Sequence, residues 1–170
     1  MQTATLKLYS LSYAQMKTYL VATAFAVCNI VLPQVVHFIP QGGFIFLPIY
    51  FFTLIGAYKY GWKVGLLVAV LSPVLNHLLF GMPPPAVLPI ILVKSALLAF
   101  AAGFAAHHFQ RISIPILALV VLSYQFFGTF VEWAMVGDFF IAIQDFRIGI
   151  LGMLIQIFGG YFVIKYLIRK

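Results

Sequence analysis

Long apolar runs alternate with short polar or Pro/Gly-rich breaks along the whole chain. Most runs have the length that an α-helix needs to cross a bilayer, roughly 20 residues. The pattern predicts an all-α, polytopic membrane protein: a single six-helix bundle over residues 1–170, with spans at about 18–32, 44–57, 62–80, 86–106, 112–136 and 148–168. The first span is expected to stop at Pro33, which cannot continue the helical hydrogen bonds. The second is short, so we expect it to borrow loop residues or to thin the bilayer locally.

The composition excludes a soluble globule. Of the 170 residues, 64% are hydrophobic and 8% are charged, and the mean hydropathy is +1.10. Soluble domains have roughly 45–50% apolar and about 25% charged residues. No arrangement of this chain into an inside and an outside would leave a wettable surface. Six spans with short connectors also leave no room for a soluble catalytic domain.

The charged residues indicate membrane topology and no nucleic-acid partner. The net charge is +7, but the basic residues flank the spans and do not cluster with exposed aromatic residues. One side of the predicted bundle carries eight of them: Lys7, Lys17, Lys59, Lys63, Arg111, Lys165, Arg169 and Lys170. The other side carries only Arg147, and Lys94 lies within a span. This asymmetry predicts a multi-pass protein of the cell (inner) membrane with both termini cytoplasmic.

Polar side chains within the spans gather toward the outer ends. Lys94 lies about 12 Å deep in the fourth span at 1.5 Å per residue, where a lysine is costly. In the fifth span, the spacing of Gln125, Gly128, Thr129 and Glu132 places them on one helix face. Lipid cannot satisfy such groups, so we expect a small-molecule site that opens outward. Its candidate residues are Lys94, Glu132, Asn76, His77, Trp133, Gln125, Thr129, Gln156 and Tyr124.

These residues also have structural interpretations. Lys94 and Glu132 can neutralise each other as a buried pair, Asn76 can hydrogen-bond between helices, and Trp133 can lie in the membrane interface. Asp145 belongs to a segment that is typical of a wet loop and that can double as a lid. If Lys94 and Glu132 contact ligand, a lone buried cation opposite a lone buried acid favours a zwitterionic or carboxylate-bearing heteroaromatic compound, stacked on an aromatic side chain.

No catalytic or metal-binding motif is present in the sequence. It has no phosphate-binding glycine loop, no His/Glu zinc helix and no Ser/His/Asp constellation. The single Cys28 excludes an intrachain disulfide. We therefore expect no enzymatic activity, no cofactor and no metal site. The repeated half-broken helices of ion-coupled transporters are also missing, so we expect a protein that binds a solute without powering its movement.

Ala22 and Ala26 lie one helical turn apart in the first span. Together with Asn29 they form a smooth strip, because small side chains permit close approach of helices. The strip either packs inside the bundle or docks a partner helix, and the residues alone leave both interpretations open.

In size, spans and topology the chain resembles the S component of energy-coupling factor (ECF) transporters, a small six-helix membrane subunit. The resemblance covers nearly the whole chain and rests on the Ala22-x-x-x-Ala26 motif, on residues 56–65 (GAYKYGWKVG) and on residues 76–84 (NHLLFGMPP). It implies a subunit that captures a vitamin or related micronutrient outside the cell. It also implies association, through Ala22 and Ala26, with a membrane coupling (T) subunit and two ATPases that drive uptake.

A second interpretation comes from a different class of protein. Small bundles that resemble S components also serve as non-transport scaffolds, as in the rod-shape-determining membrane proteins, which bind partner proteins and no vitamin. A scaffold has no need of costly polar side chains within its spans. Lys94, Asn76 and Glu132 therefore favour the solute binder.

Overall fold

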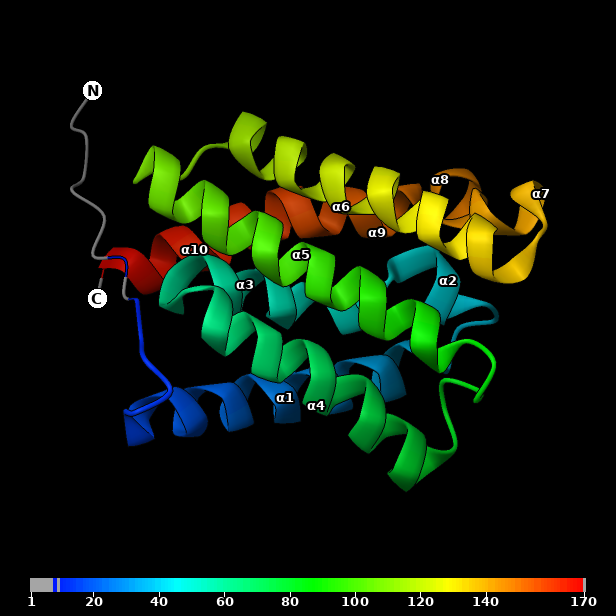
Figure 1. The fold of residues 1–170 in the computed structure, drawn as a ribbon, viewed down its shortest axis with the longest axis horizontal. Coiled ribbons are helices and arrows are strands. Elements are labelled where there is room, and N and C mark those ends of the chain that lie inside the picture. The colour runs from blue at the N-terminus through cyan, green and yellow to red at the C-terminus, as the bar shows by residue number, and fades with distance from the viewer. Residues whose placement is uncertain (1–7, 9, 170) are drawn as a thin grey trace.

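The computed structural model describes residues 8 and 10–169, which form helices and connecting segments without strands. In chain order the elements are α1 (Met16–Val36), α2 (Gly42–Phe46), η1 (Pro48–Tyr50), α3 (Phe51–Tyr60), α4 (Trp62–Phe80), α5 (Leu88–Phe109), α6 (Ile114–Val136), α7 (Phe139–Ala142), α8 (Gln144–Ile148), α9 (Ile150–Leu154), η2 (Ile155–Gly159) and α10 (Gly160–Arg169). Figure 1 shows the start of α1 and the end of α10 at one end of a bundle, termed here the terminal end. The short helices α2, α7 and α8 lie at the other, the loop end.

Five helices are long and apolar enough to cross a membrane. They are Met16–Val36, Trp62–Phe80, Leu88–Phe109, Ile114–Val136 and Ile150–Leu167. Their outer faces carry large apolar side chains in contact with the surroundings, such as Phe104 and Leu119, which are 69% and 60% exposed. A surface of this kind suits lipid and not water. By length and composition, the chain is an all-helical, multi-pass membrane protein.

The predicted second span, residues 44–57, is not one crossing helix, and the count of six spans is not confirmed. The segment divides into α2, η1 and α3, because Leu47 has left-handed backbone (φ 47°) and Pro48 begins a new helical turn. The 10 residues of α3 extend about 15 Å at 1.5 Å per residue, half of the roughly 30 Å hydrocarbon core. Leu47 and Tyr50, on either side of the break, are only 4% and 3% exposed, and Pro48 is also buried. The broken backbone is thus enclosed by protein, where it is tolerated at membrane depth.

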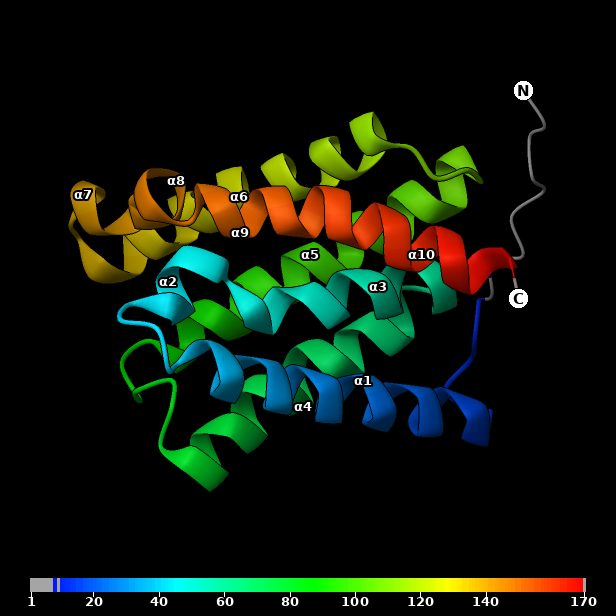
Figure 2. The same cartoon turned by 180° about the vertical axis from the view of Figure 1, so that it is seen from behind.

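The middle of the bundle is α3, which packs against α1, α4, α5 and α10. Figure 2 shows α3 between α1 and the continuous helix formed by α9, η2 and α10. Small residues allow α3, α4 and α5 to approach closely. A Cβ atom on Gly65 would collide with Ala57 of α3, and one on Gly103 would collide with the backbone of Trp62. Gly65 of α4 and Gly103 of α5 therefore serve internal packing.

The first helix does not stop at Pro33, as its sequence predicts, but continues to Val36. Proline has no N–H, so Pro33 cannot donate a hydrogen bond to the carbonyl of Asn29. The side-chain amide of Asn76 on α4 donates to this carbonyl instead, at 3.1 Å. The missing bond within α1 is thus replaced by a bond between α1 and α4, and the helix continues without an unsatisfied carbonyl.

Ala22 and Ala26 face into the bundle, with 1% and 2% of their surface exposed. Ala22 belongs to a small core cluster with Leu11, Val64 and Val68. Of the two interpretations of this pair, the structure shows internal packing against α4. A partner helix can reach these methyl groups only if α1 separates from α4.

We expect Ala22→Leu to lower the free energy of unfolding by about 1–3 kcal/mol, because the larger side chain overpacks the contact with Val64 and Val68. Ala24→Leu is the matched control, since Ala24 is exposed, and we expect a change within about 0.5 kcal/mol. Unfolding in mild detergent by titration with SDS measures both values. If Ala22→Leu is as stable as the unmodified chain, the internal contact is wrong and docking becomes the better interpretation of this pair.

Candidate functional site

Three charged side chains from three helices meet inside the bundle near the loop end. The Lys94 Nζ atom of α5 lies 2.5 Å from Glu132 Oε2 of α6 and 2.8 Å from Asp145 Oδ2 of α8. The exposed fractions of these side chains are 3%, 14% and 12%. The Lys94–Glu132 pair is one of the alternatives that the sequence predicts. The wet-loop interpretation of Asp145 is wrong, because this residue is buried and completes the charge cluster.

The fold of the segment after α6 brings Asp145 to Lys94. The helix α6 ends at Gly137, whose φ of 77° turns the chain. The Asp138 carboxylate then accepts two backbone N–H bonds from the start of α7, at 2.8 and 3.2 Å. This is the usual arrangement of a capping aspartate. With α7 packed on α6 and α8 packed on α2, Asp145 lies within reach of α5.

The predicted polar face of α6 lies next to the charge cluster. Gln125, Gly128 and Thr129 are buried, as their spacing predicts, and Glu132 forms the ion pair. Gly128 leaves room for the aliphatic part of Lys94, because a Cβ atom at this position would lie 2.7 Å from Lys94 Cγ. The side chain of Lys94 therefore depends on a glycine of the neighbouring helix to reach its two carboxylates.

A second polar group lies along the same helix, toward the middle of the bundle. The Tyr124 hydroxyl donates to Gln156 Oε1 at 2.9 Å, and Gln125 Nε2 donates to the Tyr124 hydroxyl at 3.2 Å. None of these three residues is more than 1% exposed. Gln156 lies in the π-helical turn η2, a feature often found at functional sites. Asp145 interacts electrostatically with Tyr124, which joins this group to the charge cluster.

Two residues that lie at these two groups are not among the candidate residues from the sequence. They are Tyr50 and Asp145. The ring centroid of Tyr50 lies 5.5 Å from that of Tyr124, and Asp145 also interacts electrostatically with Tyr50. Tyr50 lies in an apolar run that gives no signal for a site. For Asp145 a signal existed, because a lysine deep in a span needs buried counter-charges and the chain has only three acidic residues.

We define the polar site as Lys94, Glu132, Asp145, Tyr50, Tyr124, Gln125 and Gln156. Four buried polar atoms in or next to these residues have no hydrogen-bond partner in the part of the chain that the structure describes: Ser95 Oγ, Gln125 Oε1, Thr129 Oγ1 and Gln156 Nε2. An unpaired buried polar atom costs about 1–3 kcal/mol, so proteins retain few of them. The two amides thus offer a free acceptor and a free donor. Among residues 8 and 10–169, no three His, Cys, Asp or Glu side chains come together to hold a metal ion.

Asn76 and His77, two predicted site residues, have their hydrogen-bond partners elsewhere. The Asn76 amide donates to the carbonyls of Asn29 and Ser72, each at 3.1 Å. His77 Nδ1 lies 2.8 Å from the carbonyl oxygen of Pro83, in the loop that follows α4. The structure therefore shows the interhelical alternative for Asn76 and a loop contact for His77.

Trp133 and Thr129 line a small apolar cavity of about 210 Å³ between α6 and the segment that holds α7 and α8. Trp133 is 44% exposed and meets the edge of Phe139 with ring centroids 5.4 Å apart. The other walls are aromatic or aliphatic: Phe126, Phe130, Ile143 and Phe146. An exposed tryptophan among such residues fits the membrane-interface interpretation and not a stacking contact in the polar site.

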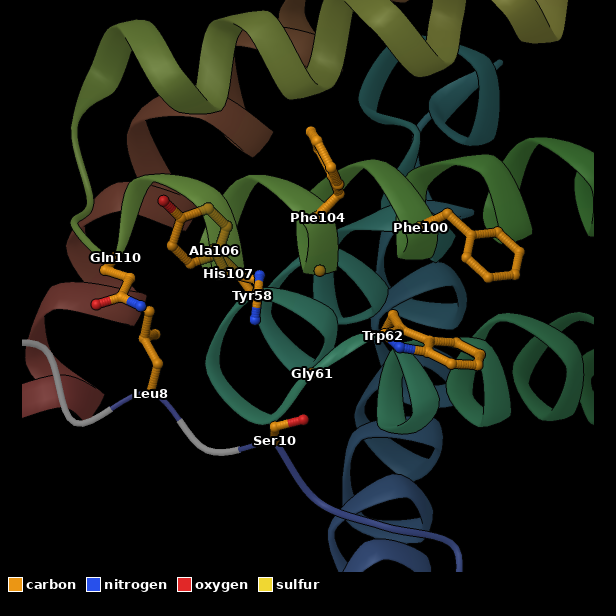
Figure 3. Close-up of a pocket in the computed structure, with 11 residues that line it drawn as sticks. Leu8, Ser10, Tyr58, Gly61, Trp62, Phe100, Phe104, Ala106, His107 and Gln110 are labelled. Carbon is orange, nitrogen blue, oxygen red and sulfur yellow. The ribbon is translucent and has the colours of Figure 1, made fainter.

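A larger cavity, of about 760 Å³, lies at the terminal end of the bundle. Figure 3 shows aromatic side chains around it, among them Tyr58, Trp62, Phe100 and Phe104. None of the described residues that line it is Lys, Arg, Asp or Glu. The sequence prediction missed this cavity, although Phe100, Phe104 and His107 recur at helical spacing on α5. Their spacing is equally typical of a lipid-facing helix surface.

Fold and site together define a multi-pass, all-helical membrane protein with a buried polar site near its loop end. Comparison of the chain with protein-family models, with curated proteins and with solved structures finds no significant match. The resemblance to ECF S components therefore rests on the sequence features given above, and the function is proposed from the site.

Proposed function

We propose that this protein is the substrate-capture subunit of an ECF-type ABC importer, which binds a vitamin or related micronutrient for ATP-driven uptake. The polar site is the observation that carries the proposal. An ammonium, two carboxylates and two half-paired amides lie buried in an otherwise apolar bundle. Such groups are costly within a membrane and mark binding sites by default. A bundle that needed only to hold itself together would be as stable with apolar side chains there.

In this proposal the segment from α2 to α3 serves as the second of six crossings. An even number of crossings places both termini on one side of the membrane, in agreement with the asymmetry of Lys and Arg. The terminal end, with Lys63, Arg111 and Lys165, then faces the cytoplasm. The polar site, near the loop end, faces the outside of the cell, where the substrate arrives.

Uptake requires partners, because the sequence contains no nucleotide-binding motif. The proposed partners are a membrane coupling (T) subunit and two ATPases. Docking through Ala22 and Ala26 requires α1 to separate from α4, since both side chains are buried. Capture of the substrate does not depend on that particular contact.

The first test is the thermal stability of the detergent-purified protein with a panel of water-soluble vitamins and their precursors. A ligand that binds only the folded state stabilises it by about 2.7 kcal/mol at a hundredfold excess over Kd. We expect Tyr124→Phe to weaken binding about tenfold, because the hydroxyl that holds Gln125 and Gln156 is lost. Tyr19→Phe is the matched control, since this ring is exposed, and should bind as the unmodified protein does.

The second test is uptake. Proteoliposomes that contain this protein with an ECF coupling module should accumulate the ligand only when ATP is supplied to the ATPases. If no compound of the panel shifts the melting temperature and no coupling subunit co-purifies, the proposal is overturned. The non-transport scaffold that resembles rod-shape-determining membrane proteins would then be the better interpretation.

A further inference from the structure

The polar site contains more negative than positive charge. The Lys94 ammonium contacts both the Glu132 and the Asp145 carboxylate, at 2.5 and 2.8 Å. Within the described part of the chain, no other Lys, Arg or His forms an ion pair with either acid. Arg147, two residues from Asp145, is exposed. One ammonium and two carboxylates leave the cluster with a formal charge of −1.

No second basic side chain among the described residues pairs with this excess charge. The neighbouring side chains from η1, α6 and η2 are tyrosines and amides, which carry no charge at neutral pH. A buried carboxylate without a full counter-charge is unfavourable. Both acids retain slight exposure, 14% and 12% of their side chains. An incoming cation would complete the charge balance, whereas an incoming anion would add to the excess.

We propose that the ligand of the polar site is an organic monocation, held by the Glu132 and Asp145 carboxylates and hydrogen-bonded by the free ends of the Gln125 and Gln156 amides. The inference rests on the proposed function and names its substrate class. It replaces the zwitterionic or carboxylate-bearing compound that the sequence suggests. That expectation balanced Lys94 against Glu132 alone, and Asp145 changes the balance.

The unpaired amide atoms favour an organic cation over a metal ion. Gln125 Oε1 is an acceptor and Gln156 Nε2 is a donor, and both lack partners among the described residues. Metal ions of the alkali and alkaline-earth groups bind oxygen ligands and cannot accept a hydrogen bond from an N–H group. An organic cation with its own donor and acceptor groups satisfies both amides. The adjacent rings of Tyr50 and Tyr124, 5.5 Å apart, add aromatic surface that attracts cations.

The test presents compounds of different charge to the protein at the same time. The full chain in lipid nanodiscs is equilibrated with an equimolar mixture of monocations (thiamine, choline, nicotinamide riboside), neutral compounds (riboflavin, nicotinamide) and anions (pantothenate, biotin, nicotinate). Gel filtration removes free compounds, and mass spectrometry identifies those that remain bound. We expect a monocation to be retained. We expect Asp145→Asn to weaken its binding at least about tenfold. Asp138→Asn should leave binding unchanged, because Asp138 is exposed and asparagine caps a helix about as well as aspartate does.

Each outcome decides the proposal. A retained neutral or anionic compound overturns the cationic ligand but supports a solute-capture protein. Retention of no compound overturns both. If Asp145→Asn does not fold, Glu132→Gln replaces it, because each variant keeps one ion pair to Lys94. A monocation that binds equally well to both variants would show that the two carboxylates do not hold it, and the inference would fail.

Discussion

Lys94→Met is expected to destabilise the protein by about 3–5 kcal/mol, because removal of one partner from a buried ion pair leaves the other charge uncompensated. Here a single substitution removes the counter-charge of two carboxylates, those of Glu132 and Asp145, which lie 2.5 and 2.8 Å from the same nitrogen atom. Because both carboxylates contact the same nitrogen atom, they lie close to each other. Without Lys94, these two like charges repel. SDS titration of the purified protein in mild detergent measures the loss.

Two further variants separate the loss of charge balance from the loss of packing. Lys94→Met combined with Glu132→Gln and Asp145→Asn removes all three charges, and we expect it to recover most of the stability. Lys165→Met removes an exposed lysine that bonds only to the hydroxyl of Tyr161 among the described residues, and should change stability by at most about 1 kcal/mol. If Lys94→Met is as stable as the unmodified protein, the two acids do not need Lys94, and the charge argument for the ligand also fails.

Helices that face lipid over their whole length could be predicted closely from hydropathy. The third predicted span, 62–80, has the bounds of α4 (Trp62–Phe80), and the fourth and fifth differ from α5 and α6 by no more than three residues at either end. These helices begin and end at strong local signals. Gly81 and Gly137 take left-handed backbone at the ends of α4 and α6, as glycine does at many helix ends.

The segment from 42 to 60 could not be predicted in the same way. Its side chains are as apolar as those of a lipid-facing helix, because burial in protein and burial in lipid select the same residues. The break at Leu47 depends on left-handed backbone at a residue that seldom adopts it. Only the surrounding helices, which enclose α3, stabilise such a break. Hydropathy therefore indicated an apolar segment but not its division into three pieces.

The polar site was predictable where its residues share one helix, and less so where they come from different helices. The spacing of Gln125, Thr129 and Glu132 predicts one shared face of α6. In the structure Gln125 and Thr129 are buried there, and the partly buried Glu132 pairs with Lys94. One partner of Asn76, the carbonyl of Asn29 on α1, is 47 residues away in sequence, and no local pattern reports such a contact. Asp145 lies in the five-residue helix α8, in the segment that follows α6, where charge is typical of a surface loop. Its burial depends on Lys94 of a distant helix.

Asn29 is the clearest case of a residue whose importance lies in contacts across the bundle. Its side chain joins α1 to η1, α3 and α4. The amide Nδ2, which has two hydrogens to donate, lies within hydrogen-bond distance of Ile49 O (2.7 Å), Thr53 Oγ1 (3.1 Å) and Ser72 Oγ (3.3 Å), and Oδ1 accepts from Phe52 N at 3.1 Å. Asn29 is fully buried. The broken segment after Leu47 relies on it, since Asn29 pairs the backbone groups that this segment cannot pair within a single helix.

Asn29→Leu is accordingly expected to lower the free energy of unfolding by about 2–4 kcal/mol. Single interhelical hydrogen bonds in membranes contribute about 0.6 kcal/mol on average and up to about 1.7, and this substitution also leaves the N–H of Phe52 without its partner. The matched control is Cys28→Leu, one residue away and exposed, which should change stability by at most about 0.5 kcal/mol. SDS titration compares the two variants directly. If Asn29→Leu is as stable as Cys28→Leu, the hydrogen bonds of Asn29 do not hold the start of α3. Apolar packing alone would then hold it.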